Sequence, residues 1–598
     1  MEADADVLFE ISWEVCNKVG GIHTVIVSKA ALMKEINKVY YLIGPYVEKK
    51  ARIVFSKEEV PLEFQKIFDE LSQEGIICHY GKWDIKGEPK TILIEFSGFA
   101  NRKNDIKKEL WDRFRIDSLN SGWDFEEPVL WSYASAKLIE KFVNLNKKKI
   151  VVHFHEWLAG AGLLYLTGKI PTIFTTHATT LGRTMASAGR ELYNTLDTLD
   201  ADREAYSLGI NAKHQLEKAC AHNATVFTTV SEITSIEAEK ILGKKPDILV
   251  LNGLDTDKFP TFEELSIKHR ESRSIIREFV SYYFFPYYFF DIEETLIFFI
   301  VGRYEFKNKG VDIFIKSLAN LNNMLKEEKS KKTIIAFFWI PRDVLSTRTE
   351  LAQNKNTYDN VKHFVERYLP TLQLKILDTI FMDPLENFAN EKKFCKPGKL
   401  FDRDFLKGAK RLKLNFVKEG NPPITTHFLA GEEHDIIVKN LLDTGLDNKE
   451  DDRVKVIFYP VYLSGVDGLL DLPYYDTIVG CHLGLFPSYY EPWGYTPLES
   501  AALGVPSLTT DLGGFGRFLI NQKRDGQGIY VLKRFKTSEE EIITHFTKIL
   551  YDFCKLNRED RVREKINAKN TSNLADWRLL IQNYTKAHNL ALEKHKSQ

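Results

Sequence analysis

Short apolar runs alternate with amphipathic stretches along most of the 598-residue chain. The runs are apolar throughout rather than at every second position, which is typical of parallel strands buried on both faces of a sheet. The stretches between them, such as 24–36 and 311–326, have the apolar spacing of helices and complete β–α–β units. We predict strands at 7–11, 38–44, 91–96, 150–155, 171–177, 225–231, 247–253, 296–303, 333–340, 454–460, 483–488 and 505–510.

Two successive groups of strands predict two domains, because a single domain rarely exceeds about 250 residues. We assign 1–255 and 256–573 to two doubly wound parallel-sheet domains of the Rossmann-like α/β class. The stretch 341–450 is polar, charged and without clear strands, and we predict it as a helical insertion in the second domain. The segment 574–598 is predicted as a helix that packs back on the first domain. Since ligands of such sheets bind beyond the carboxyl ends of the strands, we expect one cleft between the domains.

Composition narrows the class of protein. The 82 basic and 83 acidic residues nearly cancel, which argues against broad binding to nucleic acid or to a membrane surface. The aromatic stretch 279–290 is shorter than the roughly 20 residues that span a bilayer, and we predict a place in the core or in a subunit contact. Widely spaced cysteines without a Cys-x-x-Cys pair indicate reduced thiols in a cytoplasmic protein. They are Cys16, Cys78, Cys220, Cys395, Cys481 and Cys554.

A glycine pair lies between the first predicted strand and the first predicted helix, in the segment Lys18-Val-Gly-Gly-Ile22. Gly20 and Gly21 let the backbone approach an anion closely, and a helix that starts at Thr24 offers free N–H groups and the positive end of its dipole. Lys18 adds positive charge. The segment therefore favours a phosphate-binding turn, with a plain tight turn as an equal alternative.

Two cations leave the end of another predicted strand. Arg303 and Lys309 each adjoin a glycine in the loop 302–310. Fixed cations there would neutralise a departing nucleotide diphosphate, whose negative charge grows as its bond to a sugar breaks. A solvated charged loop is the alternative.

The segment 486–500 is dense in polar and aromatic side chains. Glu491 follows a predicted strand, and Glu499 lies eight residues later on a predicted helix. Gly494 and Thr496 place backbone and hydroxyl donors at the start of that helix, where phosphate binds readily. We predict that Glu491 binds a reacting sugar and that Glu499 binds the hydroxyls of a ribose. For Glu499, capping of the helix is the alternative.

Histidines follow two further strands. His177 could bind a sugar hydroxyl or a developing charge, and a satisfied structural histidine is the alternative. His153, His155 and Glu156 resemble metal ligands, but their spacing fits no standard zinc pattern. We interpret them as a wall of the cleft and predict no metal site.

The chain resembles the eukaryotic type of glycogen synthase (glycosyltransferase family 3) over essentially its whole length. The matching segments are 14–22, 154–160, 175–179, 226–234, 302–310, 452–458 and 480–497. The resemblance implies the GT-B fold and retaining transfer of glucose from UDP-glucose to growing glycogen. It also implies no metal or other cofactor, a homotetramer joined through the insertion, and a glycogenin-type primer as partner.

The resemblance assigns roles to individual residues. Glu491, Arg303, Lys309 and His177 match the family's catalytic positions. Tyr474 falls where the family stacks an aromatic ring on uracil. The donor-binding residues expected are Lys18, Gly20, Gly21, Asn252, Tyr474, Trp493, Gly494, Tyr495, Thr496 and Glu499.

Animal and fungal relatives bind glucose 6-phosphate at an arginine cluster near the C-terminus. The corresponding stretch, 558–569, keeps several cations but is diluted by Glu and Asn, and a solvated helix face is an equal alternative. The candidate sugar-phosphate residues are His269, Arg273, His482, Arg558, Arg561, Arg563 and Lys565.

Two rival functions stay open. One is another GT-B glucosyltransferase of the starch type, which uses ADP-glucose; the run 489–495 argues against it. The other is a catalytically inactive glucan-binding scaffold, which the intact set of candidate catalytic residues disfavours.

Overall fold

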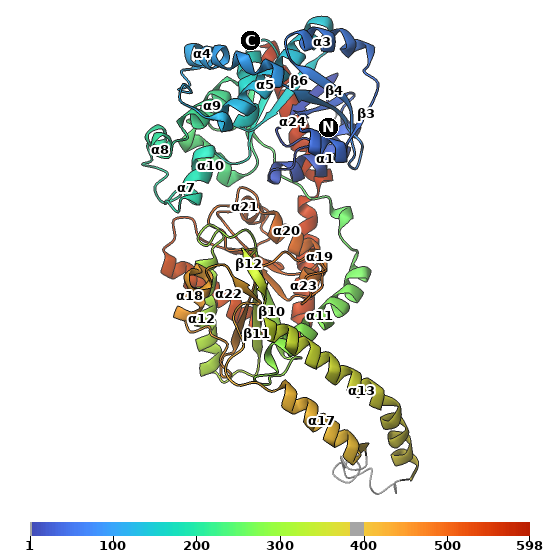
Figure 1. The fold of residues 1–598 in the computed structure, drawn as a ribbon. Coiled ribbons are helices and arrows are strands. Elements are labelled where there is room, and N and C mark those ends of the chain that lie inside the picture. Colours follow the sequence, from blue (N-terminus) through green and yellow to red (C-terminus); the bar gives the residue numbers. More distant parts are fainter. Residues whose placement is uncertain (1–2, 383–399, 598) are drawn as a thin grey trace.

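The computed structural model describes residues 3–382 and 400–597, which form two layered α/β domains (Figure 1). The first holds a nine-stranded sheet of order β3-β4-β5-β2-β1-β6-β7-β8-β9, parallel except at β3–β4 and β4–β5. Its strands are β1 (Val7–Ile11), β2 (Tyr40–Pro45), β3 (Phe55–Lys57), β4 (Ile77–Trp83), β5 (Lys90–Glu95), β6 (Ile150–His155), β7 (Thr172–Thr176), β8 (Val226–Thr229) and β9 (Ile248–Leu249).

Helices cover this sheet on both faces, as expected for a doubly wound domain. They are α1 (Gly21–Ile36), α2 (Glu48–Val54), α3 (Leu62–Gln73), α4 (Lys103–Phe114), α5 (Trp123–Leu145), α6 (Gly160–Leu166), α7 (Thr180–Ser187), α8 (Ala201–Ser207), α9 (Asn211–Asn223) and α10 (Glu232–Ile241). Single 3-10 turns are η1 (Ser97–Arg102), η2 (Trp157–Ala159) and η3 (Thr256–Lys258).

The second domain holds a six-stranded, fully parallel sheet of order β14-β11-β10-β15-β16-β17. Its strands are β10 (Thr295–Val301), β11 (Thr333–Trp339), β14 (Val454–Tyr459), β15 (Leu483–Leu485), β16 (Ser507–Thr510) and β17 (Ile529–Leu532). Its helices are α11 (Phe262–Phe284), α12 (Val311–Glu327), α18 (Ile436–Asp443), α19 (Tyr474–Val479), α20 (Tyr495–Ala502), α21 (Gly514–Asn521), α22 (Glu539–Lys555) and α23 (Arg558–Ser572), with 3-10 turns η4 (Glu432–His434) and η5 (Asn573–Ala575). The predicted pair of parallel-sheet domains is therefore confirmed.

The predicted insertion contains both helix and strand. α13 (Thr349–Met382) and α17 (Arg403–Phe416) lie side by side and project away from the second sheet (Figure 1). The rings of Phe364 and Phe405 stack between them at 5.1 Å. The prediction of no strand is wrong, because β12 (Val344–Thr347) and β13 (His427–Leu429) form a two-stranded antiparallel ribbon. Strands this short lack the long apolar run that signals a buried strand.

The aromatic run at the end of α11 belongs to the core of its own domain. Tyr283 and Phe284 are completely buried, in one cluster with Phe337 of β11 and Tyr459 of β14. Phe289 is the exposed member of the run, at 68 %. The predicted place of the run in the core is therefore confirmed: it covers one face of the second sheet.

The last helix, α24 (Trp577–Lys596), contacts α1 and strands β6 to β9 of the first domain. The indole of Trp577 donates to Ser28 Oγ at 2.8 Å and lies flat against Gly253, where a Cβ would approach the ring to 2.5 Å. The chain thus returns to its first domain (Figure 1).

Neither membrane spans nor disulfides occur in the described residues. No helix of this part of the chain is long and apolar enough to cross a bilayer. The five cysteines it contains are free, four of them buried. Cys395 lies outside the described residues.

Candidate active site

Side chains from one domain hydrogen-bond to the other at the carboxyl ends of the two sheets. The hydroxyl of Tyr490, in the loop after β15, donates to Glu237 Oε1 of α10 at 2.9 Å. Glu237 also accepts the backbone N–H of Thr179, in the loop after β7, at 3.2 Å. Because Glu491 follows Tyr490 and His177 lies two residues before Thr179, this carboxylate brings both candidate catalytic loops together at the boundary between the domains.

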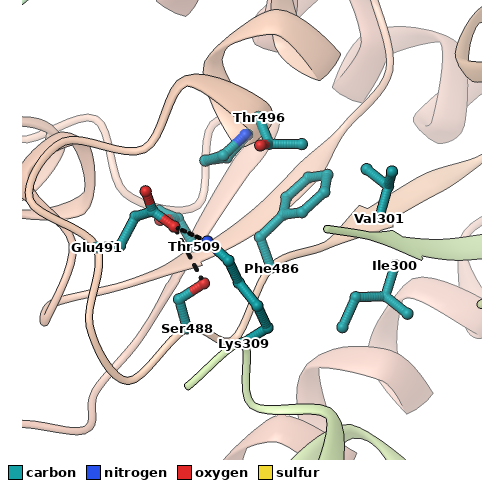
Figure 2. Close-up of a pocket in the computed structure, with 9 residues that line it drawn as sticks. Ile300, Val301, Lys309, Phe486, Ser488, Glu491, Thr496 and Thr509 are labelled. Atoms are coloured by element: carbon teal, nitrogen blue, oxygen red, sulfur yellow. Dashed lines mark hydrogen bonds and ion pairs between the residues drawn. The ribbon is translucent and has the colours of Figure 1, made fainter. Parts of the chain in front are cut away.

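A pocket opens beside this contact, and the close-up in Figure 2 shows its lining. Lys309 and Glu491 meet in it: Lys309 Nζ lies 2.6 Å from Glu491 Oε2, and Ser488 Oγ lies 3.4 Å from the same oxygen. The described lining residues are Ile300, Val301, Lys309, Phe486, Ser488, Glu491, Thr496, Pro497 and Thr509.

Gly310 explains why Lys309 can reach Glu491. It has a left-handed φ of 69°, and a Cβ would lie 2.0 Å from the carbonyl oxygen of Pro487. Only glycine allows this backbone to pass so close to the loop that carries Glu491. The sequence thus fixes the approach of two loops that are almost 180 residues apart.

Arg303 is not brought into this pocket. Its side chain is 82 % exposed and pairs with Glu305 at 3.0 Å. The two cations that the sequence placed together therefore separate, with Lys309 inside the pocket and Arg303 in solvent.

The start of α20 forms another side of the pocket. Gly494 caps the helix with a left-handed φ of 112°, which favours glycine, and the side chain of Thr496 lines the pocket (Figure 2). Tyr495 packs between two apolar clusters, and Trp493 is buried against Phe515, so their rings are structural in this state.

Glu499 has a partner that the sequence did not reveal. The hydroxyl of Tyr475 donates to Glu499 Oε1 at 3.1 Å. The neighbouring Tyr474 is partly buried, and the centres of the two tyrosine rings are 5.2 Å apart. Burial raises the pKa of Glu499 to about 7, although the hydrogen bond from Tyr475 opposes that rise. In the sequence, only the position of Tyr475 beside Tyr474 could have pointed to this partner of Glu499. Asn252 is 4 % exposed and does not line the pocket.

The amides of the glycine turn already hold a carboxylate. Glu14 Oε2 accepts the N–H groups of Gly20 at 2.7 Å and of His23 at 3.0 Å. Helix α1 starts at Gly21, three residues earlier than predicted, with this carboxylate at its positive end. Lys18 is exposed, and Gly21 has open space where a Cβ would be. An anion at this turn would share the site with Glu14.

His177 is the end of a buried chain of polar side chains. Its Nε2 lies 2.9 Å from Nδ1 of His155, whose Nε2 lies 2.6 Å from Glu10 Oε1. Burial, followed by the positive charges nearby, holds the pKa of His177 well below its ordinary value, so the ring is neutral. The backbone N–H of His177 donates to Glu156 Oε1 at 2.9 Å, which fixes the loop.

Three groups of this chain could in principle ligate a metal. One atom each of Glu10, His153 and His155 lie within 4.8 Å of one another. The ammonium of Lys29, however, pairs with Glu10 at the same oxygen that contacts His155, and His153 Nε2 lies 2.6 Å from Thr175 Oγ1. Hydrogen bonds within the protein already engage all three candidate ligands.

A second cluster of cations lies where α23 meets α11. Lys565 donates to His269 Nε2 at 2.8 Å, and Arg273 donates to the carbonyls of Gly480 and Cys481 at 3.0 Å each. Burial, with Arg273 adding to it, holds the pKa of Lys565 well below its ordinary value. In the described residues both cations donate only to uncharged acceptors, so the cluster can accept an anion.

The other candidates near this cluster divide into two sets. His482 is buried and accepts the N–H of Ile297 at 2.9 Å. Burial holds the pKa of His482 well below its ordinary value, and nearby positive charges, including that of the partly buried Arg561, add to this effect. Arg558 and Arg563 are exposed, and Arg563 pairs with Asp560 at 3.1 Å.

Comparison with known proteins gives a consistent result. The family model described as glycogen synthase matches residues 10–598. The chain is 37 % identical to "Glycogen [starch] synthase, liver" of Mus musculus, over 98 % of this chain and 83 % of that protein. It is 36 % identical to "Glycogen [starch] synthase isoform 2" of Saccharomyces cerevisiae, over 98 % and 86 %. The catalytic domain of starch synthase IV from Arabidopsis thaliana, bound to ADP and acarbose, shares the fold with a TM-score of 0.50 at 13 % identity, covering 98 % of this chain and 99 % of that one.

The buried carboxyl of Glu499 predicts a pH-dependent loss of stability. Its pKa of about 7 exceeds the ordinary 4.5, so the folded protein keeps a proton that the unfolded chain releases between these values. Stability contributed by this group is present below pH 4.5 and lost as pH rises to about 7. Relative to Glu499→Gln, the wild-type free energy of unfolding should fall by about 3 kcal/mol over that window.

Urea unfolding of both proteins at pH 5 and pH 7.5 measures this difference. Glu263→Gln removes an exposed carboxylate of the same domain and serves as the control. A difference between Glu499→Gln and wild type that does not change with pH would contradict the assignment.

Proposed function

The chain belongs to the glycogen synthase family and is a glycosyltransferase with the GT-B fold, and from this we propose its reaction. It transfers glucose from UDP-glucose to the non-reducing end of an α-1,4-glucan, with retention at the anomeric carbon. One observation carries the proposal: Lys309 and Glu491 face each other in a pocket at the carboxyl ends of the strands of the second sheet. The cation can bind the diphosphate of a nucleotide sugar, and the carboxylate can bind its sugar.

The diphosphate of UDP is the leaving group, so catalysis requires positive charge that is already in place. Lys309 supplies it once the phosphate replaces Glu491 as its partner. The free N–H groups at the start of α20, at Tyr495 and Thr496, add the positive end of a helix dipole. The exposed side chain of Arg303 would join them when the donor binds. These charges act in place of a metal ion.

Retention needs an attack on the same face that the leaving group departs from, or two successive inversions. Among the described lining residues Glu491 is the one carboxylate, whereas the two-carboxylate route of glycosidases needs a second. We therefore favour front-face attack by the acceptor hydroxyl, with Glu491 orienting the sugar. Closure of the domains around Tyr490 and Glu237 excludes water, which would otherwise hydrolyse the donor.

The activity itself is tested by transfer of radiolabelled glucose into glycogen. We expect incorporation from UDP-glucose and little from ADP-glucose, because the family resemblance covers the whole chain. Glu491→Gln should abolish transfer while leaving the protein folded. Preferential use of ADP-glucose would favour the starch-type alternative, and no transfer from either donor would favour a glucan-binding scaffold.

The two cations of the loop after β10 should act on turnover. We expect Lys309→Ala and Arg303→Ala each to lower kcat by about 10²–10³, because each removes charge stabilisation of the leaving diphosphate. Binding of UDP, measured by calorimetry, should weaken far less. Lys307→Ala, an exposed lysine of the same loop, is the matched control. Near-normal turnover in either test variant would remove that residue from the mechanism.

The buried cation cluster supports control by glucose 6-phosphate. A phosphate would give Arg273 and Lys565 the anionic partner that they lack among the described residues. We expect glucose 6-phosphate to increase the rate or lower the KM for UDP-glucose, and Lys565→Met to remove that response. Arg563→Met, which changes an exposed arginine on the same helix, should keep it. An unchanged rate and KM on addition of glucose 6-phosphate would contradict this role.

The projecting helices and the free cysteines support proposals about assembly and location. The projecting helices α13 and α17 expose apolar side chains, among them Leu369, Phe381 and Leu414. Such a face favours contact with another copy of the chain, and we propose a homotetramer joined through it. Free cysteines support a cytoplasmic location, where a glycogenin-type protein would supply the primer.

A further inference from the structure

A series of three hydrogen-bonded side chains runs from the centre of the first sheet to the loop that follows β7. Glu10 lies on β1, His155 at the end of β6, and His177 just after β7. Glu10 Oε1 contacts His155 Nε2 at 2.6 Å, and His155 Nδ1 contacts His177 Nε2 at 2.9 Å. Glu10 and His155 have no exposed side-chain surface, so water does not compete for these hydrogen bonds.

The carboxylate end of this chain is ionised. Burial alone would raise the pKa of Glu10, but the charge of Lys29 and the hydrogen bond from His155 outweigh it and hold the pKa well below its ordinary value. Tyr40 donates its hydroxyl to the other carboxylate oxygen at 2.5 Å. An ionised carboxylate only accepts hydrogen bonds, so His155 Nε2 must carry a hydrogen.

The hydrogen positions then follow along the chain. Burial lowers the pKa of His155, so the ring is neutral and its Nδ1 has a lone pair instead of a second hydrogen. That lone pair faces His177 Nε2, which must therefore be the donor in the 2.9 Å contact. Since His177 is also neutral, its remaining nitrogen, Nδ1, is an acceptor.

We propose that Glu10, acting through His155, holds His177 in the single tautomer with hydrogen on Nε2, so that Nδ1 presents a lone pair to a sugar hydroxyl in the cleft. The second half of this statement rests on the proposed function. Glu10 and His155 are thus positioning residues: they touch no substrate but decide whether His177 accepts or donates there.

Buried side chains of β6, α1 and α24 pack around Glu10 and His155. The ring of His153 stacks on His155 at 4.3 Å, and His153 Nδ1 lies 3.2 Å from His588 Nε2 of α24. Lys29 Nζ also lies 4.7 Å from the ring centre of Tyr584 on the same helix. His588 belongs to this buried network but contacts neither Glu10 nor His177 in the described residues. It therefore offers a matched control within the same cluster.

Nitrogen NMR of the full-length protein, labelled with 15N-histidine, reads the tautomer directly. The His177 signals are identified by their loss in His177→Asn. In the unliganded wild type we expect a pyridine-type shift for Nδ1 and a pyrrole-type shift for Nε2. A pyrrole-type Nδ1 would overturn the proposal. This measurement needs no activity, so its failure is distinct from failure of the proposed function.

Variants test whether the chain sets the tautomer. His155→Phe removes the acceptor, and Glu10→Leu with Lys29→Met replaces the buried ion pair by apolar groups of similar size, which proteins often tolerate. In each we expect the two His177 nitrogens to shift toward averaged values and kcat/KM to fall at least 10-fold. His588→Gln should leave both nitrogen shifts unchanged. An unaltered His177 tautomer in a folded His155→Phe or double variant would overturn the role of the chain.

Discussion

The contact of Tyr490 with Glu237 is the constraint on which the cleft depends. Glu237 is buried and accepts from Tyr490 of one domain and from the backbone of Thr179 in the other. Burial raises the pKa of Glu237 to about 7, although the hydrogen bonds from Thr179 and Tyr490 oppose that rise. The carboxyl group therefore titrates close to neutral pH. Because His177 and Glu491 lie within two residues of this carboxylate's partners, its geometry sets their separation. This carboxylate is one of several side chains that join the two domains, among them Tyr489, which accepts from Leu192 N, and Arg517, which pairs with Glu232.

Charges in the cleft are neutralised within the protein, in a way that a nucleotide sugar can replace. Lys309 pairs with Glu491, and the amides at the start of α1 hold the carboxylate of Glu14. A diphosphate carries the kind of charge that both the lysine and the amides bind. Donor binding would therefore exchange internal contacts for contacts with the ligand.

The sequence predicted what local patterns can encode. Both sheets, most of their parallel strands and the loop 302–310 follow from apolar runs and glycines. The antiparallel strands β3 and β4, at one end of the first sheet, were missed because their partly exposed side chains give no continuous apolar run. Glu14, Tyr475 and Glu10 were missed for another reason: their roles arise from partners that only the fold brings near. The exposed position of Arg303 was also not predicted, since a strand end fixes a backbone position but not the direction of a long side chain.

A crystal structure of the wild-type protein with UDP-glucose bound tests the central claim most directly. The account predicts the diphosphate against Lys309 and the start of α20, with glucose between His177 and Glu491 and the Tyr490–Glu237 hydrogen bond intact. A nucleotide sugar bound away from Lys309 and Glu491, or a sugar with no contact to His177, would contradict it.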